Sequence, residues 1–287
     1  MYNVRIIQSP DRIEIYKVNN YIIKESTKDE GYKLIDKLLK DSEEVTKEKK
    51  NKQSLEARRK TLNKSRNNIM RLIQANQDMK VFLTLTFKKE NDYKESKAKL
   101  NIFFTKLRKT YRNLKYIWVL EYGDINKRLH FHVLCNIPIH IPLANSSEKK
   151  SEQHKNLEKT FEKKYWNYGF IDIRSLTQCE DNIALALYVS NYIVKNLKDL
   201  DLEGYRVYGY SRKTLNKPVE VKFYSKQSIE QLIKMYPGYK IRYSNNYSIG
   251  YTDYRREHQG QVTYIDLIKI KENDYVSKKC RYISKLY

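Results

Sequence analysis

Two histidines and one glutamate are spaced so that they could hold a metal ion. The stretch "RLHFHVL", residues 128–134, places His130 and His132 one residue apart in an apolar run. Successive side chains of a β-strand point to opposite faces, so both imidazoles would share one face and Phe131 the other. The apolar segment "YIWVLEYG" precedes it closely enough for a hairpin, which would bring Glu121 beside His130. Two imidazoles and one carboxylate suit a divalent ion such as Mn²⁺ or Mg²⁺.

The same histidines could also be ordinary strand residues, because an H-x-H pattern alone is weak evidence for a metal site. A structural zinc site would normally have four protein ligands, often cysteines. Cys135 lies an odd number of residues from His132 and so would face away. Cys135, Cys179 and Cys280 form no C-x-x-C pair and indicate no disulfide framework, which favours a reducing compartment.

A candidate nucleophile lies in the apolar, helical segment "NIALALYVSNYIVKNL". Tyr188, Tyr192 and Lys195 are spaced i, i+4 and i+7, which places them within about 60° on a helical wheel. The apolar residues occupy the other side, which argues against simple core packing of the tyrosines. A tyrosine needs help to ionise at neutral pH, and a nearby cation or a metal-bound target phosphate can supply that help.

The most basic segment, Lys47–Ile73, has ten Lys and Arg residues and two Glu. Leu55, Leu62, Ile69 and Ile73 form one stripe on a helix, and cations occupy the opposite side. One face could then pack while the other contacts a phosphate backbone, although a solvated surface helix would show the same pattern. The candidate DNA contacts in this segment are Arg58, Arg59, Lys60, Lys64, Arg66 and Arg71.

The net charge points to nucleic acid. The 287 residues include 57 Lys and Arg against 34 Asp and Glu, a formal net charge of +23. Such a protein is expected to bind a polyanion, most often nucleic acid, although an AT-rich genome also favours lysine codons. No apolar run approaches the ~20 residues that span a bilayer, and no signal-peptide pattern is present. We therefore expect a cytoplasmic protein with neither a membrane partner nor a small-molecule cofactor.

Alternating strand and helix patterns must position these residues. We expect strands at 80–89, 116–121, 129–138 and 169–176, with Thr84 and Thr86 on one face of the first. Amphipathic helices are predicted at 96–114 and 181–197, and a polar loop leads into a helix within 145–164. The N-terminal 3–23 reads as a β-hairpin followed by a helix at 32–39, and the C-terminal part as short strands with a helix at 227–235. The pattern predicts an α+β fold.

Three short motifs, in this order, resemble those of the HUH endonucleases, which are named for histidine-hydrophobe-histidine. Within them the chain is similar to the rolling-circle replication initiators of small phages and plasmids. "FLTLTF" resembles motif 1, "HFHVL" motif 2, and "YVSNYIVK" the tyrosine motif with its trailing lysine. "VLEYG" resembles the acidic third ligand, and "YGYSRKTLNKP" a Ser-Arg…Lys-Pro segment of phage-type initiators. The resemblance covers about residues 55–218.

The resemblance implies a central antiparallel, RRM-like sheet with helices around it and the tyrosine helix across the site. It implies that the protein nicks single-stranded or extruded origin DNA in a bacterial host cell, leaving a 5′-phosphotyrosine and a free 3′-OH, and later reseals the strand. Tyr192 would be the first nucleophile, assisted by Lys195. Asn191 replaces a lysine common in two-tyrosine members, so Tyr188 is either a second nucleophile or a packed or DNA-stacking residue. Further DNA contacts are expected at Thr84, Thr86, Arg128, Arg212 and Lys213.

The implied organisation has four parts. They are an N-terminal hairpin and helix at 1–45, a basic helix at 46–76, an endonuclease domain at 77–218 and a C-terminal α/β extension at 219–287. The sequence has no Walker A motif, so a host helicase and a DNA polymerase are expected partners. The alternatives are a conjugative relaxase, a single-tyrosine transposase or a non-enzymatic basic nucleic-acid-binding protein. The three-histidine cluster and N-terminal tyrosine motif of relaxases are missing here.

Overall fold

The computed structural model describes residues 1–19, 22–23, 47–89, 92–122, 128–177, 182–195, 205–252 and 257–270. Within these ranges, residues 47–58, 122, 182, 193–195, 251–252 and 257–259 are described by their backbone alone. The chain divides into two compact units. The central unit is residues 45–217, and the terminal unit joins residues 1–44 to residues 218–287. Within the described ranges, no helix has the length and apolar character to cross a membrane.

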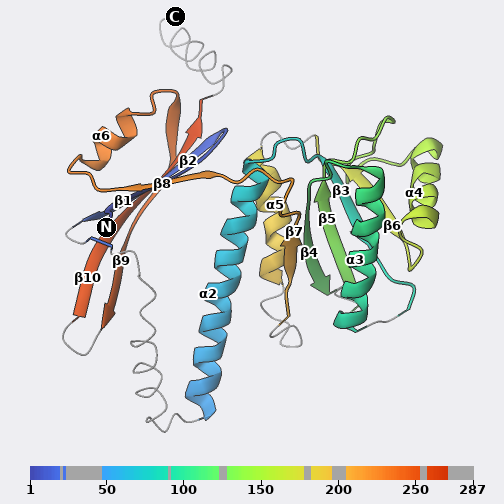
Figure 1. Cartoon of the computed structure of the whole chain (residues 1–287), viewed down its shortest axis with the longest axis horizontal. Helices are drawn as coiled ribbons and strands as arrows, with labels where there is room; N and C mark the ends of the chain where they lie inside the picture. Colours follow the sequence, from blue (N-terminus) through green and yellow to red (C-terminus); the bar gives the residue numbers. More distant parts are fainter. Residues whose placement is uncertain are drawn as a thin grey trace, which may run out of the picture. The chain divides into compact units, whose positions relative to one another are not determined.

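The central unit is built on a five-stranded antiparallel sheet (Figure 1). Its strand order is β6-β3-β5-β4-β7, so the strands of the first two motifs lie at the centre. This confirms the predicted α+β fold with a central antiparallel sheet, consistent with an RRM-like arrangement. The strands are β3 (Val81–Leu85), β4 (Tyr116–Tyr122), β5 (Leu129–Cys135), β6 (Ile171–Ser175) and β7 (Tyr208–Tyr210).

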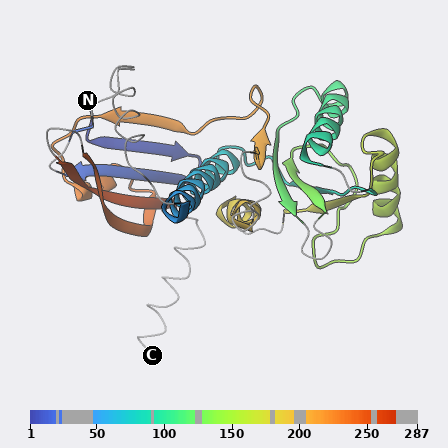
Figure 2. The same cartoon turned by 90° about the horizontal axis from the view of Figure 1, so that it is seen from below.

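Helices cover both faces of this sheet (Figure 2). On one face, α3 (Tyr93–Thr110) buries Phe103, Phe104 and Leu107, and α4 (Glu152–Lys164) packs beside it on β6. The other face carries α5 (Asn182–Lys195), which packs on β4. Because neighbouring strand residues alternate in direction, the first face receives the apolar core and the second receives the candidate functional side chains.

The basic segment forms one long helix, α2 (Lys47–Gln74), which packs against α5. The predicted apolar stripe is confirmed for Leu62, Ile69 and Ile73, each less than 10% exposed. Lys60 and Lys64 lie on the exposed side, as expected. The side chains of Leu55 and Arg58 lie outside the described residues. The helix therefore contributes to the core and presents cations to solvent at the same time.

The terminal unit has its own antiparallel sheet, ordered β8-β1-β2-β10-β9. The predicted N-terminal hairpin is β1 with β2, and the predicted C-terminal helix is α6, which begins with a capping box at Ser228. Leu232 of α6 is buried against Ile13, Ile15 and Leu267 of the sheet. The elements are β1 (Val4–Ser9), β2 (Arg12–Asn19), β8 (Val219–Phe223), α6 (Ile229–Lys234), β9 (Tyr239–Thr252) and β10 (Glu257–Lys269).

The two ends of the chain, which the sequence alone presents as separate extensions, thus share one sheet. β1 pairs with β8, and β2 pairs with β10 across some 250 residues of sequence. Inside this sheet, Arg12 Nε donates to Asp266 Oδ1 at 2.6 Å, and both side chains are almost fully buried. The helix predicted at 32–39 lies outside the described residues.

A close backbone contact joins the chain before β6 to the end of β3. Thr86 N donates to Phe170 O and Lys88 N donates to Tyr168 O, each at 3.0 Å. Between these bonds, a Cβ atom on Gly169 would lie only 1.9 Å from the carbonyl oxygen of Thr86. Only glycine fits there without a backbone shift.

We predict that Gly169→Ala destabilises the central unit by about 1–3 kcal/mol, because the added methyl group forces the backbone of Thr86 to move. Chemical denaturation followed by tryptophan fluorescence would measure the loss. Gly238→Ala is the control, since a Cβ there would meet open space. Equal stability of the two variants would contradict the close contact.

Candidate functional site

The histidine-containing strand and its neighbour place the expected ligands side by side. β4 and β5 pair antiparallel with Glu121 opposite His130, which confirms the register expected from the sequence. His132 lies two residues further along β5 on the same face. Glu121 and His132 are both less than 10% exposed, and His130 is half-buried. The three side chains therefore gather at one end of the face that also carries α5.

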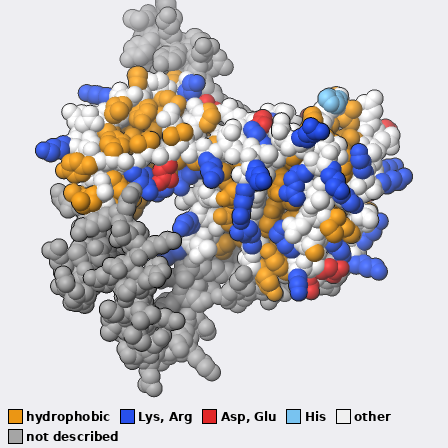
Figure 3. Space-filling view, viewed as in Figure 1, with side chains coloured by type: hydrophobic (Ala, Val, Ile, Leu, Met, Phe, Trp, Pro, Cys, Tyr) orange, Lys and Arg blue, Asp and Glu red, His pale blue; other side chains and the backbone are white. Residues whose placement is uncertain are grey.

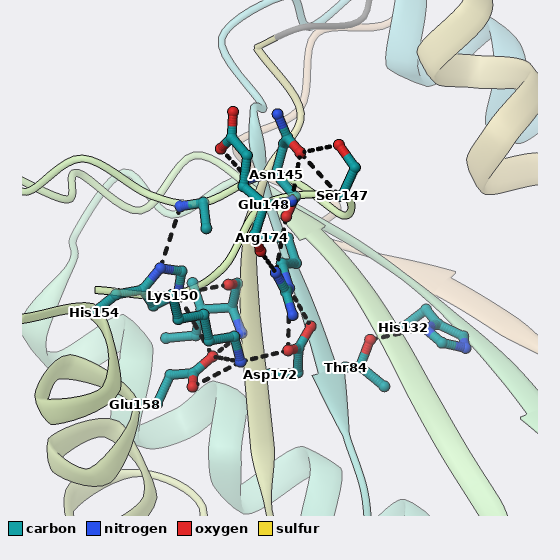
Figure 4. Close-up of polar contacts among 12 residues, drawn as sticks. Thr84, His132, Asn145, Ser147, Glu148, Lys150, His154, Glu158, Asp172 and Arg174 are labelled. Carbon is teal, nitrogen blue, oxygen red and sulfur yellow. Dashed lines mark hydrogen bonds and ion pairs between the residues drawn. The ribbon is translucent and has the colours of Figure 1, made fainter. Parts of the chain in front are cut away.

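His132 is held at both ring nitrogens. Its Nε2 lies 2.5 Å from Glu121 Oε2, and its Nδ1 lies 3.2 Å from Thr84 Oγ1 (Figure 4). A carboxylate can only accept a hydrogen bond, so the contact with Glu121 places a proton on Nε2, and Nδ1 can then accept from the Thr84 hydroxyl. The imidazole is fixed in orientation by its neighbours on β4 and β3.

Burial lowers the pKa of His130 below its ordinary value of 6.5, and the neighbouring His132 and Arg128 lower it further. The charge of Glu121 acts in the opposite direction and raises it. The net shift favours the neutral imidazole, which is the form that binds metal ions.

Among the described residues, no three His, Cys, Asp or Glu side chains are arranged to surround a metal ion. Glu121 and His132 are instead hydrogen bonded directly to each other. The donor set nevertheless has the chemistry of a divalent-ion site, with two imidazoles and a carboxylate within one register of two strands. An ion between Glu121 and His132 would require their side chains to separate slightly and the Nε2 proton to leave.

The tyrosine helix lies directly over the histidines. The ring of Tyr192 stacks on His132 with the ring centroids 4.0 Å apart. Phe82 of β3 supports the group from below, since its ring contacts His132, Tyr188 and Tyr192 at 5.5 to 6.0 Å. This aromatic cluster fixes α5 on the sheet at the position of the histidines.

The two tyrosine hydroxyls are hydrogen bonded to each other. Tyr192 Oη donates to Tyr188 Oη at 3.0 Å. Burial raises the pKa of Tyr192, and the hydrogen bond and charge of Tyr188 and the charge of Glu121 raise it further. In this state Tyr192 is protonated at neutral pH, so its activation needs added positive charge near the site. Lys195 is the last residue of α5, and its side chain lies outside the described residues.

The helical wheel separates the tyrosines from the apolar face, and the structure refines this picture. Leu185, Ala186 and Val189 are buried, and Tyr188 is 41% exposed, in line with the wheel. Tyr192 is only half-buried, because it faces the edge of the sheet where Phe82 and His132 provide an aromatic surface. Its position depends on which strand lies below the helix, which the wheel does not contain.

The part of this face over β3 and β6 is partly open. Thr84 pairs with both His132 and Asp172, so the three side chains form a row across three strands. In the next row, Thr86 and the 60% exposed ring of Phe170 lie beside the histidine end of the sheet. The open strip therefore runs alongside the candidate ligands, as an extended substrate would need.

A charged cluster borders this strip (Figure 4). Asp172 accepts hydrogen bonds from Lys150 Nζ at 2.5 Å and from Arg174 Nε at 3.1 Å. Burial opposes ionisation of Asp172, but these two cations lower its pKa below the ordinary value. Lys150 also contacts Glu158 of α4, at 2.6 Å. The cluster fixes β6 against α4 and leaves cationic groups close to the open strip.

The expected DNA contacts occupy different environments. Arg59, Lys60 and Lys64 are exposed on α2, Arg128 is exposed just before β5, and Arg212 and Lys213 are exposed after β7. Arg71 is half-buried near the end of α2. Arg66 lies between α2 and α5, where its Nε and Nη2 are 3.4 and 3.5 Å from Ser190 Oγ and Asn191 Oδ1. Lys and Arg side chains are numerous on the visible face of the central unit (Figure 3).

Several residues of this site carry no sequence signal of their own. Phe82 looks like any apolar strand residue, yet it supports both tyrosines and His132. Asp172 and Phe170 belong to a short strand segment whose neighbour is unknown until the sheet is assembled. The alternation in "GFIDIRSL" could have placed Phe170, Asp172 and Arg174 on one face, but not beside Thr84.

Comparison with known families gives a match over the part of the chain that builds this site. Residues 80–197 match a family described as replication-associated protein, of the ORF2 type. The chain is therefore similar to a replication-associated protein. The match spans β3 to the end of α5 and supports a role in the initiation of DNA replication. Neither the curated proteins nor the solved structures gave a match.

We predict that the pKa of His130 lies below 6.5 and falls further in Glu121→Gln, because this change removes the negative charge that raises it. Titration of the imidazole signals by NMR would measure both values, with His130→Asn to assign the resonance. A midpoint at or above 6.5 in the unmodified protein would contradict the described environment.

Proposed function

We propose that this protein is a rolling-circle replication initiator that nicks one DNA strand at an origin and becomes attached to it through a tyrosine. The similarity to replication-associated proteins supports the role in replication. The proposed chemistry is a metal-dependent transesterification, with Tyr192 as the nucleophile. The formal net charge of +23 supports a DNA substrate.

The observation that carries this proposal is the stacking of Tyr192 on His132. The ring centroids are 4.0 Å apart, and His132 is itself hydrogen bonded to Glu121. A helix from one part of the chain thus presents a nucleophile directly at the candidate ligands, which tertiary packing alone achieves. Tyr188 is the more exposed of the two tyrosines and lies one turn further back.

In the proposed reaction, Tyr192 Oη attacks the scissile phosphorus and loses its proton. The P–O3′ bond breaks, the 3′ oxygen takes up a proton to become a free 3′-OH, and the 5′ phosphate remains on the tyrosine. The hydrogen bond to Tyr188 gives the departing proton a path towards solvent, because Tyr188 is 41% exposed. Attack of the 3′-OH on the phosphotyrosine reverses the step and closes the strand. The same pair of hydroxyls would allow Tyr188 to act in a second round.

We further propose that His130, His132 and Glu121 hold Mn²⁺ or Mg²⁺. The bound ion would neutralise charge on the phosphate and stabilise the leaving oxygen. On binding, the His132 proton would move from Nε2 to Nδ1, and the Thr84 hydroxyl would change from donor to acceptor. Thr84 is therefore the residue that orients His132 in both states.

The remaining chain would hold DNA around this centre. Lys60 and Lys64 of α2, Arg128 and the open strip with Thr86 and Phe170 offer phosphate contacts and an aromatic surface for a base. A host helicase and polymerase would extend the free 3′-OH.

We predict that Tyr192→Phe abolishes covalent attachment to origin DNA and leaves DNA binding intact, because phenylalanine keeps the stacking on His132 and lacks the nucleophilic oxygen. The assay separates protein–DNA adducts by denaturing electrophoresis, using DNA of the protein's own replicon and Mn²⁺. Tyr224→Phe, at an exposed position of the terminal unit, is the control.

Three outcomes would decide between the alternatives. Full adduct formation by Tyr192→Phe would overturn the choice of nucleophile. Nicking that persists in EDTA or in His130→Ala and His132→Ala would overturn the metal site. A wild-type protein that binds DNA without nicking it would indicate a non-enzymatic DNA-binding protein.

We predict that Thr84→Val lowers Mn²⁺ affinity by about 10–100-fold, because the variant keeps the shape but loses the hydroxyl that orients His132. Isothermal titration calorimetry would measure the change. Thr160→Val, which alters an exposed hydroxyl on α4, is the matched control. Equal Mn²⁺ affinity in both variants would remove Thr84 from the site.

A further inference from the structure

A second basic site lies away from the histidines and tyrosines. A pocket of about 350 Å³ is formed where the C-terminal end of α3 meets the segment that follows β7. Its walls include Arg108, Arg112, Tyr116, Ser211, Arg212 and Lys213. A pocket of this volume is large enough for a nucleotide-sized ligand.

The pocket opens on the other face of the sheet. Tyr116 and Glu121 are five residues apart on β4, so their side chains point to opposite faces. The same spacing places them roughly 16 Å apart along the strand. The ring of Tyr116 stacks on Phe104 of α3 at 3.7 Å, on the face that carries the apolar core. A ligand in this pocket is therefore bound separately from the scissile phosphate.

Four cations line the pocket, and no acidic side chain does. Arg108 donates from Nη1 to the Tyr116 hydroxyl at 3.2 Å and from Nη2 to Thr105 Oγ1 at 3.3 Å, so its partners are neutral. Within the described ranges, Arg108, Arg112, Arg212 and Lys213 form no ion pair with a carboxylate. Their positive charge is available to an anion.

The loop that supplies two of these cations is fixed in place. Ser211 Oγ accepts from Tyr116 N at 3.2 Å and from Thr214 Oγ1 at 2.8 Å, and Thr214 Oγ1 also lies 2.7 Å from Leu114 O. These bonds attach both ends of the 211–214 segment to the start of β4. Arg212 and Lys213 project from a preformed loop, so binding would not have to order its backbone.

We propose that this pocket binds one nucleotide of the DNA backbone at a point outside the cleavage site. The phosphate would lie among the guanidinium groups and Lys213, because guanidinium groups bind phosphate through paired hydrogen bonds. The sugar would contact the apolar surface of Leu114 and Tyr116. This inference rests on the proposed DNA-binding function but not on the nicking chemistry.

The proposed role is a second point of attachment. A strand joined to Tyr192 is held at one phosphate, while the pocket holds a different segment of the same DNA on the opposite face of the sheet. Binding at two points raises the effective concentration of the free segment near the protein after cleavage.

The test compares two variants with the same loss of charge. Arg112→Ala/Lys213→Ala removes two pocket cations that make no hydrogen bond with a described residue, and Lys159→Ala/Lys163→Ala removes two exposed cations of α4. Fluorescence anisotropy would follow binding to a labelled oligonucleotide in single-stranded and duplex form, over a range of salt concentrations. We expect the pocket variant to bind at least one of these probes more weakly and to reduce the salt slope by about 1–2, with little change in the control.

Adduct formation with an oligonucleotide that spans only the nick site separates this inference from the proposed function. We expect the pocket variant to form the adduct normally. Affinity and salt slope equal to those of the α4 control, for both single-stranded and duplex DNA, would overturn the pocket even if nicking is intact. If the wild type forms no adduct, the nicking proposal fails while the anisotropy comparison still tests the pocket.

Arginine modification gives an independent measurement on the unmodified full-length protein. Phenylglyoxal followed by mass spectrometry should label Arg112 and Arg212 in the free protein and label them less in the presence of the oligonucleotide. Protection by inorganic phosphate without protection by DNA would show a small-anion site and would overturn the proposal.

Discussion

The antiparallel register of β4 and β5 is the constraint on which the candidate site depends. Glu121 stands opposite His130, and His132 follows on the same face. Because side chains alternate along a strand, a slip of one residue would turn Glu121 to the face that holds the core. The register is fixed from that core face, where Trp118 and Phe131 pack edge to face at 5.6 Å. The apolar half of the hairpin thus determines where its polar half meets.

The sheet separates two functions by face. One face receives the aromatic core from α3 and α4, and its margin forms the basic pocket near Tyr116. The other face carries the histidines, Thr84 and the tyrosine helix, with Phe82 between them. α2 links these regions, since its apolar stripe packs inward against α5 and its lysines remain exposed. A small α+β unit therefore offers a nucleophile, candidate ligands and separate cationic surfaces.

The sequence by itself determined the local features. Strand alternation placed His130 and His132 on one face, and turn spacing placed Glu121 beside them, because period and register are encoded in neighbouring residues. Helical periodicity predicted α2, α3 and α5 and the buried stripe with Leu62, Ile69 and Ile73. The net charge indicated nucleic acid before any fold was known. Each of these inferences depends on residues that are close together in the chain.

Only the tertiary structure decided which distant elements meet. The stacking of Tyr192 on His132 joins residues sixty positions apart, and no local pattern places that helix over that strand. The same holds for Thr84 beside His132, for Asp172 in the next strand and for the pocket between α3 and the loop after β7. It also holds for the shared sheet of the two chain ends. Long-range contacts form because they bury apolar surface common to several elements, and one element's sequence specifies only its own share of that surface.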